Sequence, residues 1–388
     1  MIYLDNAATT PVVPAALEAA WPWLTAEFGN PSSTHELGLR AKTALESARS
    51  RIATWLDCPA SDLVFTSGGT EGDNLAITGL ALANPRGKHI ISAKTEHEAV
   101  LETLDYLERV HGFEITWLNV DHQGNIDLAE LGKALRSDTT LVTLMLANNE
   151  IGTTHPLPQI IEAAHAVGAL VHTDAVQAAG WFDLRVGKKG TIVAGVDALT
   201  ISGHKLGAPK GSGVTYIRGR LAVEPLLHGG GQEFGRRSGT ENVAWAVALA
   251  TANDSLAEVS LEGARVSALR DEFISQVLSS IPQAQLTGNP TDRHPAIASF
   301  TFAGLNGETL LLELEQRGVI VSSGSACAAG SDDPSHVLIA CGIEADVAQT
   351  SVRFSLSHST TEEELTAVAT ALVDAVSSVS DLDRKSVV

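Results

Sequence analysis

The 388-residue sequence predicts an α/β protein with a mostly parallel central sheet and a second, smaller α+β domain. Three observations support this fold class. From about residue 60 to 220, short apolar runs alternate with helical patterns, as parallel strands covered by helices require. After Thr240 this alternation stops and a different mixture of elements follows. The chain also exceeds the roughly 250–300 residues at which a single core stops growing, so two domains are expected.

The alternating region supplies the elements of the predicted sheet. Strands are expected within residues 62–69, 88–93, 113–120, 140–149, 169–175 and 197–202, and helices within residues 70–83, 97–110, 128–136 and 157–168. In an open parallel sheet, ligands bind beyond the carboxyl ends of the strands. Polar residues that directly follow these strands are therefore the first candidates for a functional site.

The C-terminal third predicts the smaller domain. Residues 242–281 fit one long helix that leads from the first domain to the second. Strand and helix patterns follow at residues 296–304, 307–318, 319–323, 350–357 and 361–379. We expect a large domain at residues 15–255 and a small domain formed by residues 1–14 and 256–388.

Composition excludes several classes of function. The 46 acidic and 26 basic residues give a net charge of -20, which repels nucleic-acid phosphates, so no direct nucleic-acid partner is expected.

The N-terminus lacks a secretion signal and no window approaches 18 uninterrupted apolar residues, so no membrane span is expected. Three scattered cysteines favour a reducing compartment, the cytoplasm by default. The 13 histidines show no zinc-binding spacing, so no metal site is predicted.

A glycine-rich turn follows the first predicted strand. In FTSGGTEGDN, the backbone around Gly69 and the hydroxyl of Thr70 are placed to bind a phosphate at the start of the next helix. The turn matches neither the phosphate loop of nucleotide-binding proteins nor the dinucleotide-binding motif. An ordinary strand–helix connection explains it equally well.

The end of the last predicted strand carries Ser202, His204 and Lys205 inside another glycine-rich turn. A lysine in such a partly desolvated place can form a Schiff base with an aldehyde cofactor. The alternative is a solvated loop lysine, and Lys210 competes for the same role. Asp174 and Gln177 follow the preceding strand, where a carboxylate can keep a pyridine nitrogen protonated or can simply cap a helix.

Two further strand ends carry His97 and Asn149. A single histidine there is more often a helix cap than a catalyst. Together, however, five strand ends present a phosphate turn, a histidine, an asparagine, an Asp/Gln pair and a lysine to the same sheet edge.

The three cysteines have different neighbours. Cys58 and Cys341 have apolar neighbours and are predicted to be packing residues. Cys327 lies among Gly, Ser and Ala residues, which suits an accessible, reactive thiol.

At this point the sequence resembles a known family, the pyridoxal-phosphate (PLP)-dependent cysteine desulfurases of the class V branch of the aspartate aminotransferase fold (fold type I). The resemblance runs essentially from end to end. It is carried by the segments YLDNAATTP, GNPSSTH, FTSGGTEGDN, TEHEAV, ANNEIGT, HTDAVQAAG, SGHKLGAPKGSG, GGGQEFGRRSGTEN, SSGSACAAG and VRFSLS. The loop around Cys327 is similar to the longer-loop group, which serves iron–sulfur assembly or thiolation.

The resemblance implies a role for each candidate residue. Lys205 would form the Schiff base and remove the α-proton of the substrate, Asp174 would pair with the pyridine nitrogen, and Gln177 would contact the ring hydroxyl. His97 would stack on the ring and assist proton transfer. The remaining roles are phosphate binding by Gly69, Thr70, Ser202 and His204, phosphate contact in a second subunit by Thr240, and binding of the substrate carboxylate by Asn149 and Arg353.

The resemblance further implies the reaction and the partners. L-cysteine would become L-alanine, the sulfur would remain on Cys327 as a persulfide, and a protein acceptor such as an iron–sulfur scaffold or thiolation enzyme would receive it. The contact through Thr240 implies a homodimer. Two alternatives stay open: a selenocysteine lyase or other class V PLP enzyme, and a non-catalytic sulfur-assembly protein with the same fold.

Overall fold

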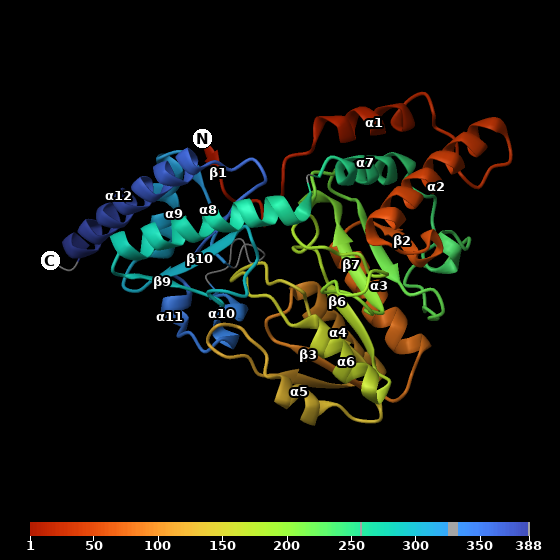
Figure 1. Cartoon of the computed structure of the whole chain (residues 1–388), viewed down its shortest axis with the longest axis horizontal. Coiled ribbons are helices and arrows are strands. Elements are labelled where there is room, and N and C mark those ends of the chain that lie inside the picture. The colour runs from red at the N-terminus through yellow and green to blue at the C-terminus, as the bar shows by residue number, and fades with distance from the viewer. Residues whose placement is uncertain (257, 325–332, 387–388) are drawn as a thin grey trace.

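The computed structural model describes residues 1–256, 258–324 and 333–386. It has two lobes that do not share a sheet (Figure 1). Helix α8 (Val259–Ser280) runs from the middle of the molecule along the smaller lobe, and the N-terminus lies on that lobe as well (Figure 1).

The larger lobe is organised by a seven-stranded sheet in the order β2-β8-β7-β6-β5-β3-β4, as counted over the described residues. Neighbouring strands from β7 to β4 are parallel, and β8 runs against both of its neighbours. The predicted mostly parallel sheet is therefore confirmed. Its strands are β2 (Leu63–Thr66), β3 (His89–Ala93), β4 (Glu114–Leu118), β5 (Thr139–Thr143), β6 (Leu170–Asp174), β7 (Ala198–Ser202) and β8 (Gly213–Ile217).

Helices cover this sheet, which is why its inner strands are buried along their whole length rather than at alternate residues. All residues of β3, β5, β7 and β8 are buried. The helices and short 3₁₀ turns of this lobe are α1 (Pro14–Leu24), α2 (Glu36–Leu56), η1 (Ala60–Asp62), α3 (Gly69–Ala83), α4 (Glu98–His111), α5 (Leu128–Ala134), α6 (Leu157–Val167), η2 (Gly203–Lys205), η3 (Glu233–Gly235) and α7 (Val243–Asp254).

The smaller lobe contains an antiparallel sheet in the order β12-β10-β9 and a parallel pair of β1 with β11. One hydrophobic cluster fills it and joins Leu4 to apolar residues between Val266 and Val379. Besides α8, its elements are β1 (Ile2–Tyr3), β9 (Ala284–Leu286), β10 (Ile297–Phe302), α9 (Gly307–Gln316), β11 (Val319–Ile320), α10 (His336–Ala340), α11 (Ala345–Ala348), β12 (Val352–Ser355) and α12 (Glu362–Ser386).

The predicted single helix over residues 242–281 is wrong. The chain forms two helices, α7 and α8, and the described residues Ser255, Leu256 and Glu258 lie outside both. The break follows the sequence Asn-Asp-Ser at residues 253–255. These residue types are poor helix formers because their side chains compete for backbone hydrogen bonds.

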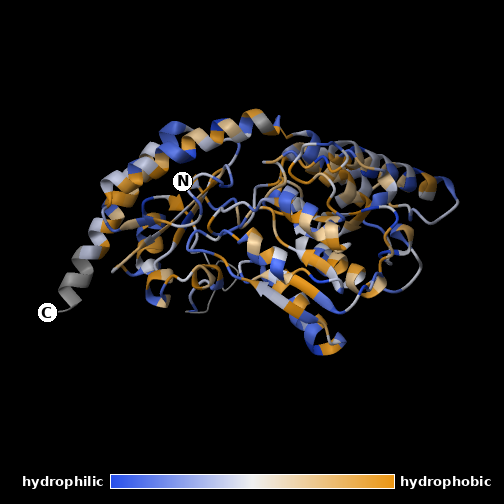
Figure 2. Ribbon diagram, turned by 60° about the horizontal axis from the view of Figure 1, so that its bottom comes forward, coloured by the Kyte–Doolittle hydropathy of each residue, from blue (hydrophilic) through white to orange (hydrophobic). Residues whose placement is uncertain are grey.

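Apolar residues concentrate on the strands and on the inner faces of the helices, and polar residues colour the outside (Figure 2). Among the described helices, none is both long and apolar enough to cross a membrane.

Candidate active site

The carboxyl ends of five strands of the large sheet meet at one cavity of about 280 Å³. Ten of the twelve predicted site residues line it, so the expected convergence of strand ends is confirmed. The lining residues are Ala7, Ala8, Gly69, Thr70, Asp73, His97, Met145, Ala147, Asn149, Asp174, Val176, Gln177, Ser202, His204, Lys205, Gly324 and Arg353.

Lys205 lies at the end of the short turn η2 and reaches into this cavity. Its Nζ donates hydrogen bonds to the carbonyl oxygens of Ala7 and of Ala8, the latter at 2.7 Å. The interpretation of Lys205 as a solvated loop lysine is therefore wrong. Lys210, its rival, is exposed and does not line the cavity.

Asp174 ends β6 and is 7% exposed. Its Oδ1 accepts the Val176 N–H at 2.8 Å, and no helix follows in residues 175–197, so the helix-cap interpretation is wrong. Burial raises the pKa of Asp174, while the charge of His97, the Val176 N–H and the charge of Lys205 act in the opposite direction. Gln177 donates from Nε2 to the Ala7 carbonyl at 2.9 Å.

The start of α3 forms an anion cradle. Gly68, the residue before the helix, has φ +152° and ψ -169°, a conformation essentially restricted to glycine, and no side chain caps the helix. The first N–H groups of this 15-residue helix are thus left for a ligand. Ser202 stands beside them, since a Cβ on Gly68 would lie 3.7 Å from its Oγ. The cradle fits a phosphate group.

His204 and His97 complete the two sides of the cavity. His204 Nδ1 hydrogen-bonds the Thr9 hydroxyl at 3.1 Å, and burial together with the charges of Lys205 and Lys210 lowers its pKa to about 4. His204 is therefore neutral at physiological pH. The Nδ1 of His97 accepts the Ala99 N–H at 3.0 Å, so His97 caps α4 and also lines the cavity.

Arg353, on β12 of the smaller lobe, closes the cavity from the other side. It is 1% exposed. Its Nη1 donates to the Asn149 carbonyl and its Nη2 to Asp5 Oδ1, both at 2.9 Å, while the buried Nε has no hydrogen-bond partner. A buried guanidinium with donors to spare suits a carboxylate ligand.

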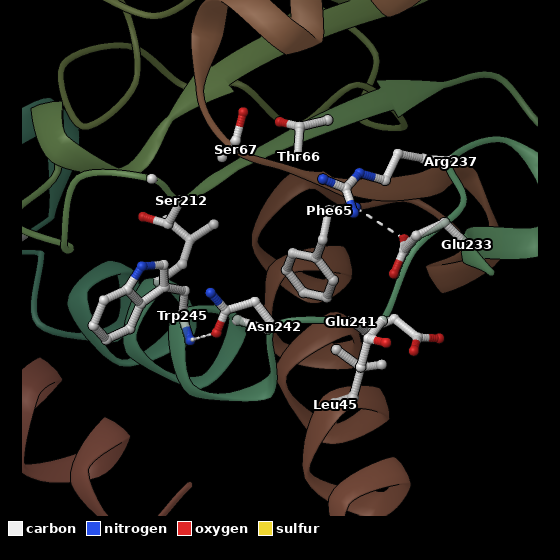
Figure 3. A pocket seen from close by; sticks show the side chains of 15 residues that line it. Leu45, Phe65, Thr66, Ser67, Ser212, Glu233, Arg237, Glu241, Asn242 and Trp245 are labelled. Carbon is white, nitrogen blue, oxygen red and sulfur yellow. Dashed lines mark hydrogen bonds between the residues drawn. The ribbon is translucent and has the colours of Figure 1, made fainter. Parts of the chain in front are cut away.

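Two predicted residues are not in this group. Thr240 is exposed and lines a second cavity of about 250 Å³, between the end of β2, the 228–242 segment and α7 (Figure 3). Cys327 lies outside the described residues, but Gly324, three positions earlier, lines the main cavity.

Sequence reasoning missed two features of the site. Residues 5–10 bring carbonyl, hydroxyl and carboxylate groups to Lys205, His204 and Arg353. No role was predicted for these residues from the sequence, and they were included only in the segment YLDNAATTP, which carries the family resemblance. Asp73, inside the predicted helix, is buried with an unpartnered Oδ1 that lies 3.6 Å from His172 Nε2. A charged residue on the sheet-facing side of a helix was the available signal.

The other two cysteines are packing residues, as predicted. Cys341 is buried among Ile151, Val337 and Leu338, and Cys58 packs against the main core. Burial raises the pKa of both thiols to about 12, so neither is a thiolate at neutral pH. No three His, Cys, Asp or Glu side chains in the described segments group in a way that suits a metal ion.

Comparison with known proteins relates this geometry to a family. Residues 2–368 match the family model described as aminotransferase class-V. A protein named cysteine desulfurase IscS from Dictyoglomus turgidum is 45% identical over 94% of this chain and 91% of its own length. A protein of the same name from Methanosarcina thermophila is also 45% identical, over 94% of this chain and 89% of its own length.

Solved structures support the same family assignment. A structure titled NifS-like protein superposes with a TM-score of 0.88 at 35% identity, covering 97% of this chain and 99% of its own. Another, titled SspA in complex with cysteine, gives a TM-score of 0.79 at 35% identity over 92% of this chain and 99% of its own. The chain therefore belongs to the aminotransferase class-V family, among relatives that are named cysteine desulfurases.

Proposed function

We propose that this chain is a PLP-dependent cysteine desulfurase that converts L-cysteine into L-alanine and keeps the sulfur on Cys327 as a persulfide. One observation carries the proposal: a single cavity joins a lysine, a buried carboxylate, an anion cradle and a buried guanidinium. The names of the most similar relatives support the same activity.

The cavity has a group for each part of PLP. The start of α3 with Thr70, Ser202 and neutral His204 would hold the phosphate, and Lys205 would bind the aldehyde carbon. The ring would lie between His97 and the opposite wall, with Asp174 at the pyridine nitrogen and Gln177 at the ring hydroxyl. When bound, PLP supplies an electron sink for negative charge at the substrate α-carbon.

The protein residues divide the remaining work. Arg353 binds the substrate carboxylate together with Asn149, and Nζ of Lys205 takes the α-proton. The Cys327 thiolate attacks the substrate sulfur, a sulfur–sulfur bond forms, and the carbon–sulfur bond breaks. The electron pair of the broken bond stays with the carbon fragment, which becomes alanine after taking up protons.

Further features belong to the same proposal. A protein acceptor, such as an iron–sulfur scaffold or a thiolation enzyme, would take the sulfur from Cys327. The enzyme would act as a homodimer in which Thr240 reaches the phosphate site of the partner. Residues 15–255 would form the cofactor-binding domain, and residues 1–14 with 256–388 the domain that carries Cys327.

The test compares the wild type with Lys205→Ala and Cys327→Ala, each loaded with PLP. Borohydride should fix PLP to the wild type and not to Lys205→Ala, and only the wild type should form alanine and sulfide from L-cysteine with a thiol reductant. Sulfide release by Cys327→Ala would sink the proposed sulfur transfer. Turnover of selenocysteine but not cysteine would instead indicate a lyase, and absence of bound PLP would indicate a non-catalytic protein.

A further inference from the structure

Residues 5–10, which we call the N-terminal strap, connect the two lobes across the cavity. The Ala7 carbonyl accepts from both Lys205 Nζ and Gln177 Nε2. Two residues earlier, Asp5 Oδ1 accepts from Arg353 Nη2 at 2.9 Å. One short segment therefore contacts both the lysine and the arginine of the proposed reaction.

Arg353 has five N–H donors, and its hydrogen bonds to Asn149 and Asp5 involve one donor each from Nη1 and Nη2. The other donors include the buried Nε, which has no partner. These two contacts fix the plane of the guanidinium while donors stay available for a ligand. Because Arg353 lines the cavity, a carboxylate there would meet an arginine already held in one orientation.

Asp5 suits this task because it is bound to Arg353 but only partly buried. The exposed fraction of its side chain is 18%, against 2% for Arg353. The strap does not depend on this ion pair for its own position. Asn6 Nδ2 donates to the Ser355 carbonyl and the Ala7 N–H to Ser355 Oγ, each at 2.9 Å.

The other end of the strap is anchored independently as well. The Thr10 N–H and hydroxyl both donate to the His204 carbonyl, at 3.0 and 2.9 Å. Removing the carboxylate of Asp5 should therefore loosen the Arg353 guanidinium and leave the Ala7 carbonyl beside Lys205.

We propose that Asp5 is a positioning residue that orients the Arg353 guanidinium for the carboxylate of the substrate. The inference rests on the proposed function, because it assumes that Arg353 binds the carboxylate of cysteine. Asp5 does not take part in the chemistry; it acts on substrate affinity through Arg353. Loss of a hydrogen bond between charged groups corresponds to roughly a 10- to 100-fold loss of affinity.

The test measures kcat and KM for L-cysteine in Asp5→Asn, which keeps the shape of the side chain and removes its charge. Because the amide oxygen of Asn can still accept the Arg353 N–H, we expect the lower end of this range, with KM about 10-fold higher and kcat within about twofold. The affinity of the cofactor-free protein for PLP, measured by fluorescence titration, should not change, because Ala7 remains in place. Asp5→Glu should recover part of the affinity. Asp254→Asn, which breaks an ion pair with Arg51 outside the cavity, is the matched control and should leave KM unchanged.

A second ligand makes the test specific. Cysteamine lacks the carboxylate of cysteine, so its dissociation constant, read from the absorbance of bound PLP, should be the same in the wild type and Asp5→Asn. An unchanged KM for cysteine in Asp5→Asn would overturn the inference, because Asp5 would then not affect substrate affinity. A lower KM would overturn it as well, because Asp5 would then compete with the substrate for Arg353. An equal loss of affinity for PLP or cysteamine would also overturn it. If Asp5→Asn does not fold, Asp5→Ser allows the same comparison. A wild type that forms no alanine from cysteine refutes the proposed function instead.

Discussion

Replacing Glu233 with Gln tests how the segment that carries Thr240 is held against β2. Arg49 is 2% exposed and donates to both carboxylate oxygens of Glu233, at 2.7 and 2.8 Å. Glu233 Oε2 also accepts the Phe65 N–H of β2 at 2.9 Å (Figure 3). Glu233 and Phe234 both have positive φ, 50° and 59°, so these contacts hold a strained backbone in place.

The size of the effect follows from burial. Removing one partner of a buried ion pair costs about 3–5 kcal/mol, because the other charge stays buried without compensation. Glu46, which is partly exposed and lies 3.3 Å from Arg49, would still compensate part of the Arg49 charge. We therefore expect a loss in the free energy of unfolding near the lower limit, about 3 kcal/mol. At an m-value of roughly 3 kcal/mol/M, the urea midpoint would fall by about 1 M.

The assay is urea unfolding followed by tryptophan fluorescence. Glu114→Gln is the matched control, because it breaks a two-bonded ion pair with Arg136 on the surface and should change the midpoint little. Combining Glu233→Gln with Arg49→Met removes both charges, so the double variant should be more stable than the sum of the single losses predicts. A decrease of less than about 1 kcal/mol in the free energy of unfolding of Glu233→Gln would refute the reasoning. A loss in the double variant equal to the sum of the two single losses would refute it as well.

Three further predictions concern the cavity and the cysteines. Gly68→Ala forces a side chain into a glycine-only conformation, so PLP binding to the cofactor-free protein should weaken by about 1–3 kcal/mol in a fluorescence titration; unchanged affinity would argue against the anion cradle. Burial and the neighbouring Asp174 raise the pKa of Asp73 well above its usual value, so the folded state keeps a proton that the unfolded chain releases. The stability of the cofactor-free wild type should then fall as pH rises above that usual pKa. Asp73→Asn does not titrate, so its melting temperature relative to that of the wild type should increase from pH 4 to 7. A difference in melting temperature that stays constant over this range would show that Asp73 is ionised. Cys58 and Cys341, whose thiols have a pKa of about 12, should resist iodoacetamide at pH 7.5 in the native protein, and peptide mapping that finds either alkylated would contradict these raised pKa values.

Strand patterns in the sequence were sufficient to predict six strands of the large sheet and the meeting of their ends, whereas β8, which lies between β2 and β7, was not predicted. Each strand there is a short apolar run followed by polar residues, and parallel strands must present those residues at one edge. This is why Lys205, Asp174 and His97 could be placed together from their positions in the sequence. The two interpretations of His97 were not exclusive, because it caps α4 and lines the cavity.

The contributions of distant segments were harder to predict. Asp5 meets Arg353 across nearly the whole length of the chain, and no local pattern encodes a contact between the two lobes. The break between α7 and α8 was overlooked because apolar spacing continues on both sides of it. The charge state of Asp73 depends on the neighbours that it has only after folding.

The central claim is that sulfur passes from cysteine to Cys327 through the chemistry of this cavity. Mass spectrometry of the Cys327 peptide, after the PLP-loaded protein has been incubated with L-cysteine and its free thiols blocked, tests this claim most directly. We expect one added sulfur atom on Cys327, none on Cys58 or Cys341, and none on any cysteine of Lys205→Ala. Formation of alanine without added sulfur on Cys327, or the same addition in Lys205→Ala, would contradict the account.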